Sequence, residues 1–234
     1  GAATPTAPML DEIRFVDAAI GQMLDALAEQ RLLGTTAVII TAKHGQSPID
    51  AHRFFPIPGH SNTNGHPPSD LVAADLPDSE INQIGSTEDD ISLLWLKPGS
   101  SVTADVALLE ANATSAGIGQ IFYGPSLATI FNAPGLPADG GDPRTPDIVV
   151  QPNVGVVYTG STKKQAEHGG FAHDDTNVML LVAHPALRAR TVTTFVETTQ
   201  VAPTILALLG LDPNALDAVR QEGTAVLPGL AFRK

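Results

Sequence analysis

The stretch that decides the fold is Ala37–Asp50, AVIITAKHGQSPID. It opens with the apolar, β-branched run Val38–Ile40, which is typical of a strand buried on both faces of a parallel sheet. The run gives way to the polar residues Lys43 and His44 and to Gly45. In open α/β sheets, ligands bind beyond the carboxyl ends of the strands. The stretch therefore predicts a site at Lys43 and His44, with a purely structural histidine as the alternative.

Composition limits the classes of protein that this chain can belong to. Its 234 residues are 43% hydrophobic, which is enough for one sizeable α/β domain. The net charge of −12 argues against nucleic acid or an anionic membrane as a partner. An anionic substrate would need local positive charge from a metal ion or from lysines. The chain has no cysteine, which excludes disulfides and thiolate zinc sites. No apolar run reaches the roughly 20 residues of a membrane span.

The residues before Ala37 predict a helix that packs on the sheet. From Met9 to Leu33, apolar residues recur at alternating spacings of three and four, and Gly34 ends the pattern. A helix, a tight turn, a buried strand and a polar loop form half of a doubly wound unit. We therefore expect an α/β fold with a mostly parallel, doubly wound sheet.

The residues after Asp50 predict a loop-rich insertion, about residues 50–90, over the carboxyl edge of the sheet. It is dense in Pro, Gly, Asn and His, with room for a short helix within Asp70–Asn82. The insertion carries His52, His60 and His66, but their spacing fits no helical pair and no tight zinc loop. We interpret these three as solvated loop residues.

Apolar and helical patterns continue to the C-terminus. They predict strands at Ile91–Leu96, Ile118–Tyr123, Asp147–Val150 and Val178–Val182, helices at Val102–Ala116 and Glu197–Leu211, a helix or turn at Ser126–Phe131, a strand or hairpin partner at Gly155–Thr159, a loop at Pro134–Pro146, and a last helix or turn at Leu216–Leu227.

A second polar cluster lies at Lys163–Val178, KKQAEHGGFAHDDTNV, directly before a predicted strand. It combines imidazole and carboxylate groups with a Gly-Gly pair. Such ligands at a strand edge suit zinc, manganese or similar ions. The alternative is a solvated loop in which Asp174 caps a turn.

Read together, AVIITAKHGQ, EHGGFAHDDTNVMLLV and VETTQVAPTILALLGL resemble the alkaline phosphatase superfamily, and within it the type I phosphodiesterase/nucleotide pyrophosphatase group. The resemblance covers most of Met9–Asp212. It implies the sheet of that superfamily, with residues 1–234 as the C-terminal portion of one α/β domain. It also implies hydrolysis of phosphate esters, with diesters or nucleotide-like molecules as the expected substrates.

The resemblance implies a divalent metal, zinc in the first place, bound by His44 and His168. Asp174, Asp175 and His173 are further candidates. Lys43 stands where the family has a metal-binding Asp, and an ammonium group beside a dication is repulsive. We therefore expect at most one ion here, with Lys43 as a substrate-binding positive charge.

The family's nucleophile, a Thr or Ser, belongs to an N-terminal half that this sequence does not contain. Ser47 and Thr41 lie near the site but lack an obvious base and a helix N-terminus. We therefore expect a piece of a longer protein, inactive alone, whose partner is the missing half or a second copy at an exposed sheet edge. No signal peptide is visible, and the resemblance alone implies a periplasmic or secreted protein. The alternatives are a non-catalytic binding domain with a degenerate site and a sulfatase-like hydrolase.

Overall fold

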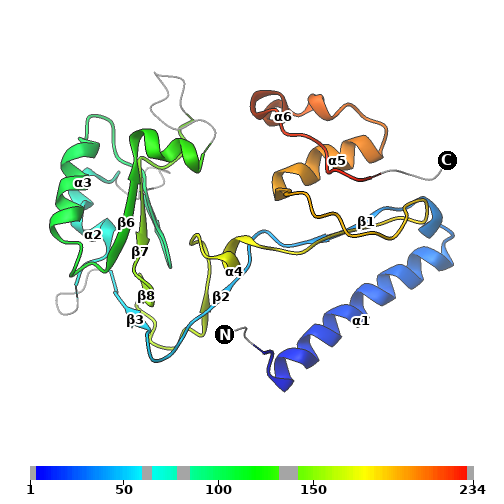
Figure 1. The fold of residues 1–234 in the computed structure, drawn as a ribbon, viewed down its shortest axis with the longest axis horizontal. Coiled ribbons are helices and arrows are strands. Elements are labelled where there is room, and N and C mark those ends of the chain that lie inside the picture. Colours follow the sequence, from blue (N-terminus) through cyan, green and yellow to red (C-terminus); the bar gives the residue numbers. More distant parts are fainter. Residues whose placement is uncertain (1–3, 60–64, 78–84, 132–141, 231–234) are drawn as a thin grey trace. The chain divides into compact units, whose positions relative to one another are not determined.

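The computed structural model describes residues 4–59, 65–77, 85–131 and 142–230 (Figure 1). The chain divides into two compact units. The first unit consists of Gly1–Lys43 and Val178–Lys234, and the second consists of His44–Asn177. The predicted site motif therefore spans a unit boundary, because Lys43 ends one unit and His44 begins the other.

The first unit joins two distant parts of the sequence through a pair of strands. Its elements are α1 (Ala7–Glu29), η1 (Leu33–Thr35), β1 (Val38–Thr41), β10 (Leu180–Ala183), η6 (Thr198–Gln200), α5 (Val201–Leu208), η7 (Pro213–Ala215) and α6 (Asp217–Glu222). Strands β1 and β10 run antiparallel, with Val38 opposite Ala183 and Thr41 opposite Leu180. The prediction that Val38–Ile40 form a strand of a parallel sheet buried on both faces is wrong for the described residues, since these three side chains are only half-buried. A short apolar run cannot reveal the direction of its partner strand.

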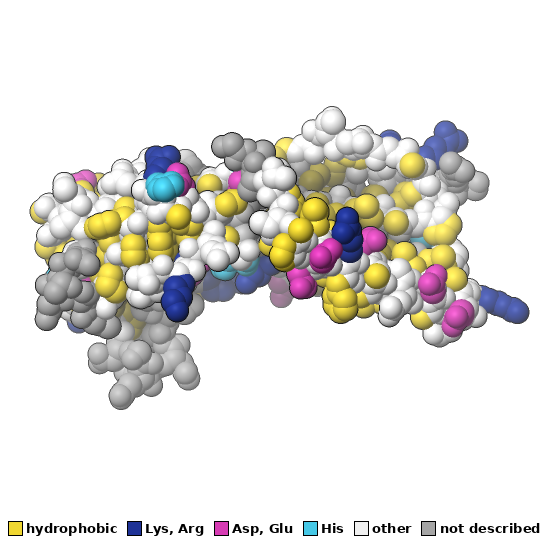
Figure 2. All heavy atoms as spheres, turned by 90° about the horizontal axis from the view of Figure 1, so that it is seen from below, with side chains coloured by type: hydrophobic (Ala, Val, Ile, Leu, Met, Phe, Trp, Pro, Cys, Tyr) yellow, Lys and Arg dark blue, Asp and Glu magenta, His cyan; other side chains and the backbone are white. Residues whose placement is uncertain are grey.

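Helix α1 confirms the predicted helix but not its predicted packing. The hydroxyl of Thr6 caps its start by accepting a hydrogen bond from the Met9 backbone N–H at 3.4 Å. No residue of α1 is fully buried, and Leu24, which is half-buried, lines a pocket with Val38 and Leu181 of the β1–β10 ladder, so the stripe as a whole does not pack closely on a sheet within the described residues. Figure 2 shows hydrophobic side chains (yellow) among charged ones on this face of the molecule. The exposed large hydrophobic residues of α1 are Met9, Leu10, Ile13, Phe15, Val16 and Met23.

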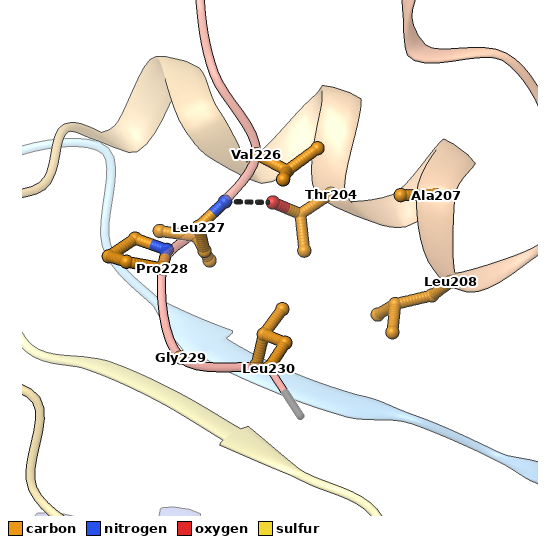
Figure 3. Close-up of a pocket in the computed structure, with 8 residues that line it drawn as sticks. All are labelled: Thr204, Ala207, Leu208, Val226, Leu227, Pro228, Gly229 and Leu230. Atoms are coloured by element: carbon orange, nitrogen blue, oxygen red, sulfur yellow. Dashed lines mark hydrogen bonds between the residues drawn. The ribbon is translucent and has the colours of Figure 1, made fainter. Parts of the chain in front are cut away.

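The C-terminal segment of the first unit is attached to α5 through the buried residue Thr204. Its hydroxyl accepts a hydrogen bond from the Leu227 backbone N–H at 2.8 Å and donates one to the Gln200 carbonyl at 2.7 Å (Figure 3). Leu208 and Leu230 help to line an apolar pocket of about 460 Å³ beside it. The predicted helix at Glu197–Leu211 is therefore confirmed as η6 followed by α5, and the predicted last helix is α6.

The second unit is built around a four-stranded sheet. Its elements are β2 (Ser47–Pro48), β3 (Phe55–Pro56), α2 (Pro68–Leu71), η2 (Ala73–Asp75), β4 (Ser86–Glu88), β5 (Ser92–Leu94), α3 (Val102–Ala111), β6 (Ile118–Tyr123), η4 (Gly124–Thr129), β7 (Ile148–Pro152), β8 (Val156–Val157), β9 (Ala166–Glu167) and α4 (His173–Thr176). The sheet order is β4-β5-β7-β6, and all of its neighbours are antiparallel.

Alternate residues of this sheet face two separate apolar layers, as the two-residue period of a strand requires. On one face, Leu94, Ile148 and Val150 pack with Val106 and Leu109 of α3. On the other face, Val149 packs with Leu127 of η4 and with Ile91. Ile148, Val149 and Val150 are fully buried, which makes β7 the centre of the second unit.

The mostly parallel, doubly wound sheet is not what the described strands show. Among the described strands only β3 and β8 pair in parallel, and the other strand pairs are antiparallel. Antiparallel strands need only short turns, and the β4–β5 connection is such a turn. The loop-rich region at about 50–90 holds β3, α2, η2 and β4. The predicted helix at Asp70–Asn82 is two short turns, and Asn82, His60 and most of the Pro134–Pro146 loop lie outside the described residues.

Candidate functional site

The two histidines singled out by sequence lie against each other in the second unit. His44 comes after β1, with Ala42 and Lys43 between them, and His168 follows β9 directly. Their imidazole rings stack with centroids 3.7 Å apart and planes inclined by 19°. Both side chains are half-buried. The prediction that His44 and His168 lie within about 10 Å of each other is confirmed, although they flank short antiparallel segments instead of the carboxyl edge of one parallel sheet.

The tautomer of His44 follows from its hydrogen bond. Its Nδ1 lies 2.8 Å from the carbonyl oxygen of Gly45. A carbonyl oxygen only accepts, so Nδ1 carries the proton in this bond and Nε2 keeps its lone pair. A backbone carbonyl that orients an imidazole in this way is a common feature of metal-binding histidines. His44 is therefore prepared to act as a ligand through Nε2.

The segment that carries His44 is fastened to Asp175, at the end of α4. The Gly45 backbone N–H donates to the Asp175 carbonyl at 2.7 Å, and the Ser47 hydroxyl donates to Asp175 Oδ1 at 2.6 Å. A Cβ at position 45 would lie 1.9 Å from the carbonyl oxygen of Asp174. Gly45 is therefore required by close approach of two backbones, and the two segments meet without intervening side chains.

The segment that carries His168 is fastened to Asp90, in the turn between β4 and β5. The Gly170 backbone N–H donates to Asp90 Oδ1 at 2.9 Å. A Cβ on Gly170 would lie 3.0 Å from Asp175 Oδ2 and 3.1 Å from the Asp90 carbonyl. The second glycine of the predicted Gly-Gly pair thus lets the chain pass between two aspartates.

Asp90 and Asp175 form a coupled carboxyl pair. Burial raises the pKa of Asp90 far above its ordinary value, and the hydrogen bond and negative charge of Asp175 raise it further. Asp175 is 3% exposed, and among the described N–H and O–H donors none reaches its Oδ2. A proton shared by the two carboxyl groups would supply that hydrogen bond.

A second charged group lies beside His168 in the chain. Lys164 Nζ pairs with Asp89 at 2.8 Å and also with Glu167, which is buried. Burial by itself would lower the pKa of Lys164, but hydrogen bonds to the two carboxylates raise it above its ordinary value. Lys164 thus neutralises charge next to the site.

The other predicted candidates are not brought to the histidine pair. His173 and Asp174 form an exposed ion pair at 3.3 Å on α4, with 79% and 62% of their side chains exposed. His52 is exposed, and His66 lies 3.7 Å from Asp70. Lys43 is exposed and belongs to the first unit, so its role stays a prediction. Sequence reasoning missed Asp90, which sits in the run Glu88-Asp89-Asp90 outside both polar clusters.

The donor chemistry of the histidine pair fits zinc only in part. Imidazole nitrogen is a usual zinc donor, but a structural zinc takes four ligands. Within the described ranges, no group of three or more His, Cys, Asp or Glu side chains is arranged to hold a metal ion. Imidazole lone pairs lie in the ring plane, and two nearly parallel planes do not meet at one nearby ion. Each ring is therefore better suited to an ion of its own than to a shared one.

Comparison with protein families gives a match that covers most of the chain. The model of the family described as type I phosphodiesterase / nucleotide pyrophosphatase matches residues 4–179. This chain belongs to that family. The family assignment agrees with the resemblance inferred from the motifs around His44 and His168. A comparison with curated proteins gave no match.

Solved structures with a similar fold include human and murine ectonucleotide pyrophosphatase / phosphodiesterase 5. The human protein is 16% identical to this chain and the murine protein 18%, each with a TM-score of 0.56. A third structure, at 17% identity and a TM-score of 0.56, is an inactive threonine-to-alanine variant of the murine protein in complex with AMP. In each case the match covers 89% of this chain and 50% of the solved chain. The chain therefore spans about half the length of these relatives, and the likeness shows the mixed α/β fold.

The lengths and hydropathy of the helices bear on whether the chain spans a membrane. Of the helices in the described part of the chain, none is both long and apolar enough to cross a membrane. The names of the two relatives mark them as ectoenzymes, which act outside the cell.

Proposed function

We propose that this chain is part of a metal-dependent phosphodiesterase that hydrolyses nucleotide-like phosphodiesters. The family match supports hydrolysis of this class, and the AMP bound to the murine relative supports a nucleotide-like substrate. The observation that carries the proposal is the stack of His44 on His168, which brings the two family-type ligands together from distant parts of the sequence.

In this proposal, His44 and His168 are each a ligand for a divalent cation at a position of its own, with zinc as the expected metal and at most one ion bound tightly. When bound, the cation polarises a phosphoryl oxygen and lowers the pKa of a hydroxyl or water. His44 contributes Nε2, because Gly45 fixes the proton on Nδ1. Local positive charge is needed because the chain carries a net charge of −12. Lys43 would add a point charge for a phosphate oxygen.

The proposal includes an inactive isolated chain. Ser47 donates its hydroxyl proton to buried Asp175, which keeps the hydroxyl in the interior of the second unit. Thr41 is the last residue of β1, and none of the described side chains is hydrogen-bonded to its hydroxyl as a base would be. The nucleophile would then come from sequence outside this chain, consistent with relatives that are about twice as long.

The partner of the first unit would be that same missing sequence or, failing it, a second copy of the chain. Helix α1 has no buried residue, and Met179 and Leu181 at β10 are exposed. An uncovered apolar helix and a two-stranded ladder with free edges favour association. We further propose an extracytoplasmic location, periplasmic or secreted, on the grounds of the ectoenzyme relatives.

One rival from another class remains open: a binding domain that keeps the fold without catalysis. Lys43 favours this rival, because it replaces an anionic metal ligand by a cation. A sulfatase-like hydrolase is a weaker third candidate, in which a lysine contacts the substrate anion.

The deciding experiment is an assay of the whole protein that contains this chain. It is incubated with an aryl phosphodiester, an aryl phosphomonoester and an aryl sulfate, each with zinc and after chelation. We expect turnover of the diester that is lost on chelation and in the His44→Ala variant, while His173→Ala, at an exposed histidine, stays active. Selective sulfate turnover would identify the third candidate. Binding of nucleotide without turnover of any substrate would establish the rival binding domain.

A further inference from the structure

Two segments that carry the histidines converge on one carboxyl pair. The backbone carbonyl of Asp175 accepts a hydrogen bond from the Gly45 backbone N–H, one residue after His44, and its carboxyl Oδ1 accepts one from the Ser47 hydroxyl. Asp90 receives a hydrogen bond from Gly170, two residues after His168. Asp90 and Asp175 both lie against Gly170, where an added Cβ would come within 3.0 Å of Asp175 Oδ2 and 3.1 Å of the Asp90 carbonyl. The backbone segments that carry the two imidazoles are thus both held against the Asp90–Asp175 pair.

Other contacts between the two histidine segments do not replace these hydrogen bonds. Strands β2 and β9 pair over only two residues each, with Ser47 opposite Glu167. This ladder aligns the segments beyond Ser47 but does not extend back to His44. The contact nearest to His44 is the bond from Gly45 to the Asp175 carbonyl.

The packing around the pair leaves little freedom for adjustment. Gly45 and Gly170 both lie where an added Cβ would meet the aspartates or their neighbours at 3.0 Å or less. Asp90 is also held from the other side, because the Gln151 amide donates to the Asp90 carbonyl at 3.4 Å. The carboxyl pair therefore has one arrangement, and that arrangement sets the separation of the two loops.

We propose that Asp175, braced by Asp90, is a positioning residue that holds the imidazole of His44 against that of His168. Neither aspartate contacts substrate or metal in this proposal, and both act through Gly45, Ser47 and Gly170. The proposal deepens the proposed function, on which it rests for the role of the two histidines as ligands. It gives a role to a buried carboxyl pair that metal binding by the two imidazoles alone does not explain.

The test uses nuclear magnetic resonance of the imidazole protons in the 234-residue chain. Stacked rings shift each other's proton resonances upfield, and His44→Ala and His168→Ala assign that mutual shift. We expect Asp175→Ala and Asp90→Ala to abolish it. Asp90→Asn should retain it, because an amide accepts from Gly170 and donates to Asp175 as the protonated carboxyl does. A purely space-filling role would also retain the shift in Asp90→Leu, whose side chain has the same branching without polar atoms, whereas we expect Asp90→Leu to lose it.

The control is Asp105→Ala, which removes another buried carboxyl, 4% exposed and on α3. It should leave the mutual shift unchanged, and thermal melts identify variants that no longer fold. If Asp175→Ala does not fold, the comparison of Asp90→Ala with Asp90→Asn decides. A shift that survives in Asp90→Ala, or that is lost equally in Asp105→Ala, overturns the proposal.

Zinc titration of the same variants separates this proposal from the proposed function. Loss of an outer-shell partner typically weakens metal binding by about 10–100-fold, and we expect that loss in Asp90→Ala. If the unmodified chain and the whole protein bind no zinc while the mutual shift behaves as expected, the positioning role stands and the metal-dependent function fails.

Discussion

The imidazole of His168 lies flat on that of His44, with 3.7 Å between ring centroids, although the two residues belong to different polar clusters of the sequence. Between them the chain forms the whole four-stranded sheet of the second unit. The stack therefore depends on correct folding of everything that separates the two histidines.

Replacing either histidine by alanine should weaken zinc binding by at least about 100-fold, because loss of an outer-shell partner alone costs about 10–100-fold. Isothermal titration of zinc into the unmodified chain and into His44→Ala and His168→Ala measures the effect. His173→Ala is the matched control, since His173 is an exposed histidine of α4. Equal affinity in all four proteins would contradict the assignment of the two ligands.

The sequence predicted this pair because its signals are local and chemical. His44 comes soon after the apolar run of β1, His168 lies in the polar segment before the apolar run that begins at Val178, and each histidine is followed by glycine. Close approach explains the glycine at position 45, where a Cβ would meet backbone at 1.9 Å. Residue type and order along the chain are enough to locate such a site.

Asp90 shows what the sequence could not provide. It becomes part of the site only because β4 and β5 bring their connecting turn against Gly170. That proximity depends on the pairing of strands, and hydrophobic periodicity does not report which strands pair or in which direction. The same limit explains the wrong expectation for Val38–Ile40, whose partner β10 is antiparallel and distant in sequence.

The hydroxyl of Thr204 in α5 should contribute to the stability of the protein, because it holds the C-terminal segment. In Thr204→Val, the buried Leu227 backbone N–H loses its acceptor at nearly constant side-chain volume. An unsatisfied buried donor costs about 1–3 kcal/mol. Denaturant unfolding of Thr204→Val should show this loss, while Thr204→Ser, which keeps the hydroxyl, should lose much less. A Thr204→Val protein as stable as the unmodified one would show that this hydrogen bond contributes nothing.

Asp105 should make the stability of the protein depend on pH. Burial, then the negative charge of Asp75 and a hydrogen bond to it, raises the pKa of Asp105 from 3.8 to about 6. The folded state therefore favours the protonated carboxyl. Its contribution to stability is complete below pH 3.8 and is lost as the pH rises through about 6.

The variant that tests this is Asp105→Asn, whose amide donates to Asp75 at every pH. Its free energy of unfolding should exceed that of the unmodified protein at pH 8, by on the order of 1 kcal/mol, and the two should converge near pH 4. Denaturant unfolding of both proteins at pH 8 and at pH 4 measures the difference between their free energies of unfolding. The titration of all other groups affects both proteins equally and cancels from that difference. A gain of the same size at pH 4 would rule out the raised pKa as its cause.

The isolated chain should self-associate. Helix α1 exposes six large hydrophobic side chains, and β10 adds Met179 and Leu181. Such surface seeks a partner. Light scattering over a wide concentration range should show a rising mean mass, and Ile13→Lys combined with Val16→Lys on α1 should reduce it. The paired control, Asp11→Lys with Glu12→Lys, adds positive charge at polar positions of the same helix. A monomer at all concentrations that binds no hydrophobic dye would contradict the prediction.

We expect Lys43 to limit how many ions the protein binds. The nearly parallel stack of His44 and His168 gives each ring a separate lone pair, which suits two ions about 4 Å apart. In place of the carboxylate that would neutralise one of them, the sequence has an ammonium group, a change of two charge units. We expect this change to disfavour a second dication wherever the ammonium group comes close to it. Titration of zinc into the whole protein should therefore give at most one tight ion, and Lys43→Asp should raise the number to two.

Lys43→Gln, which removes the positive charge without supplying a carboxylate, separates relief of repulsion from gain of a ligand. Two tight ions in the unmodified protein would exclude this role for Lys43.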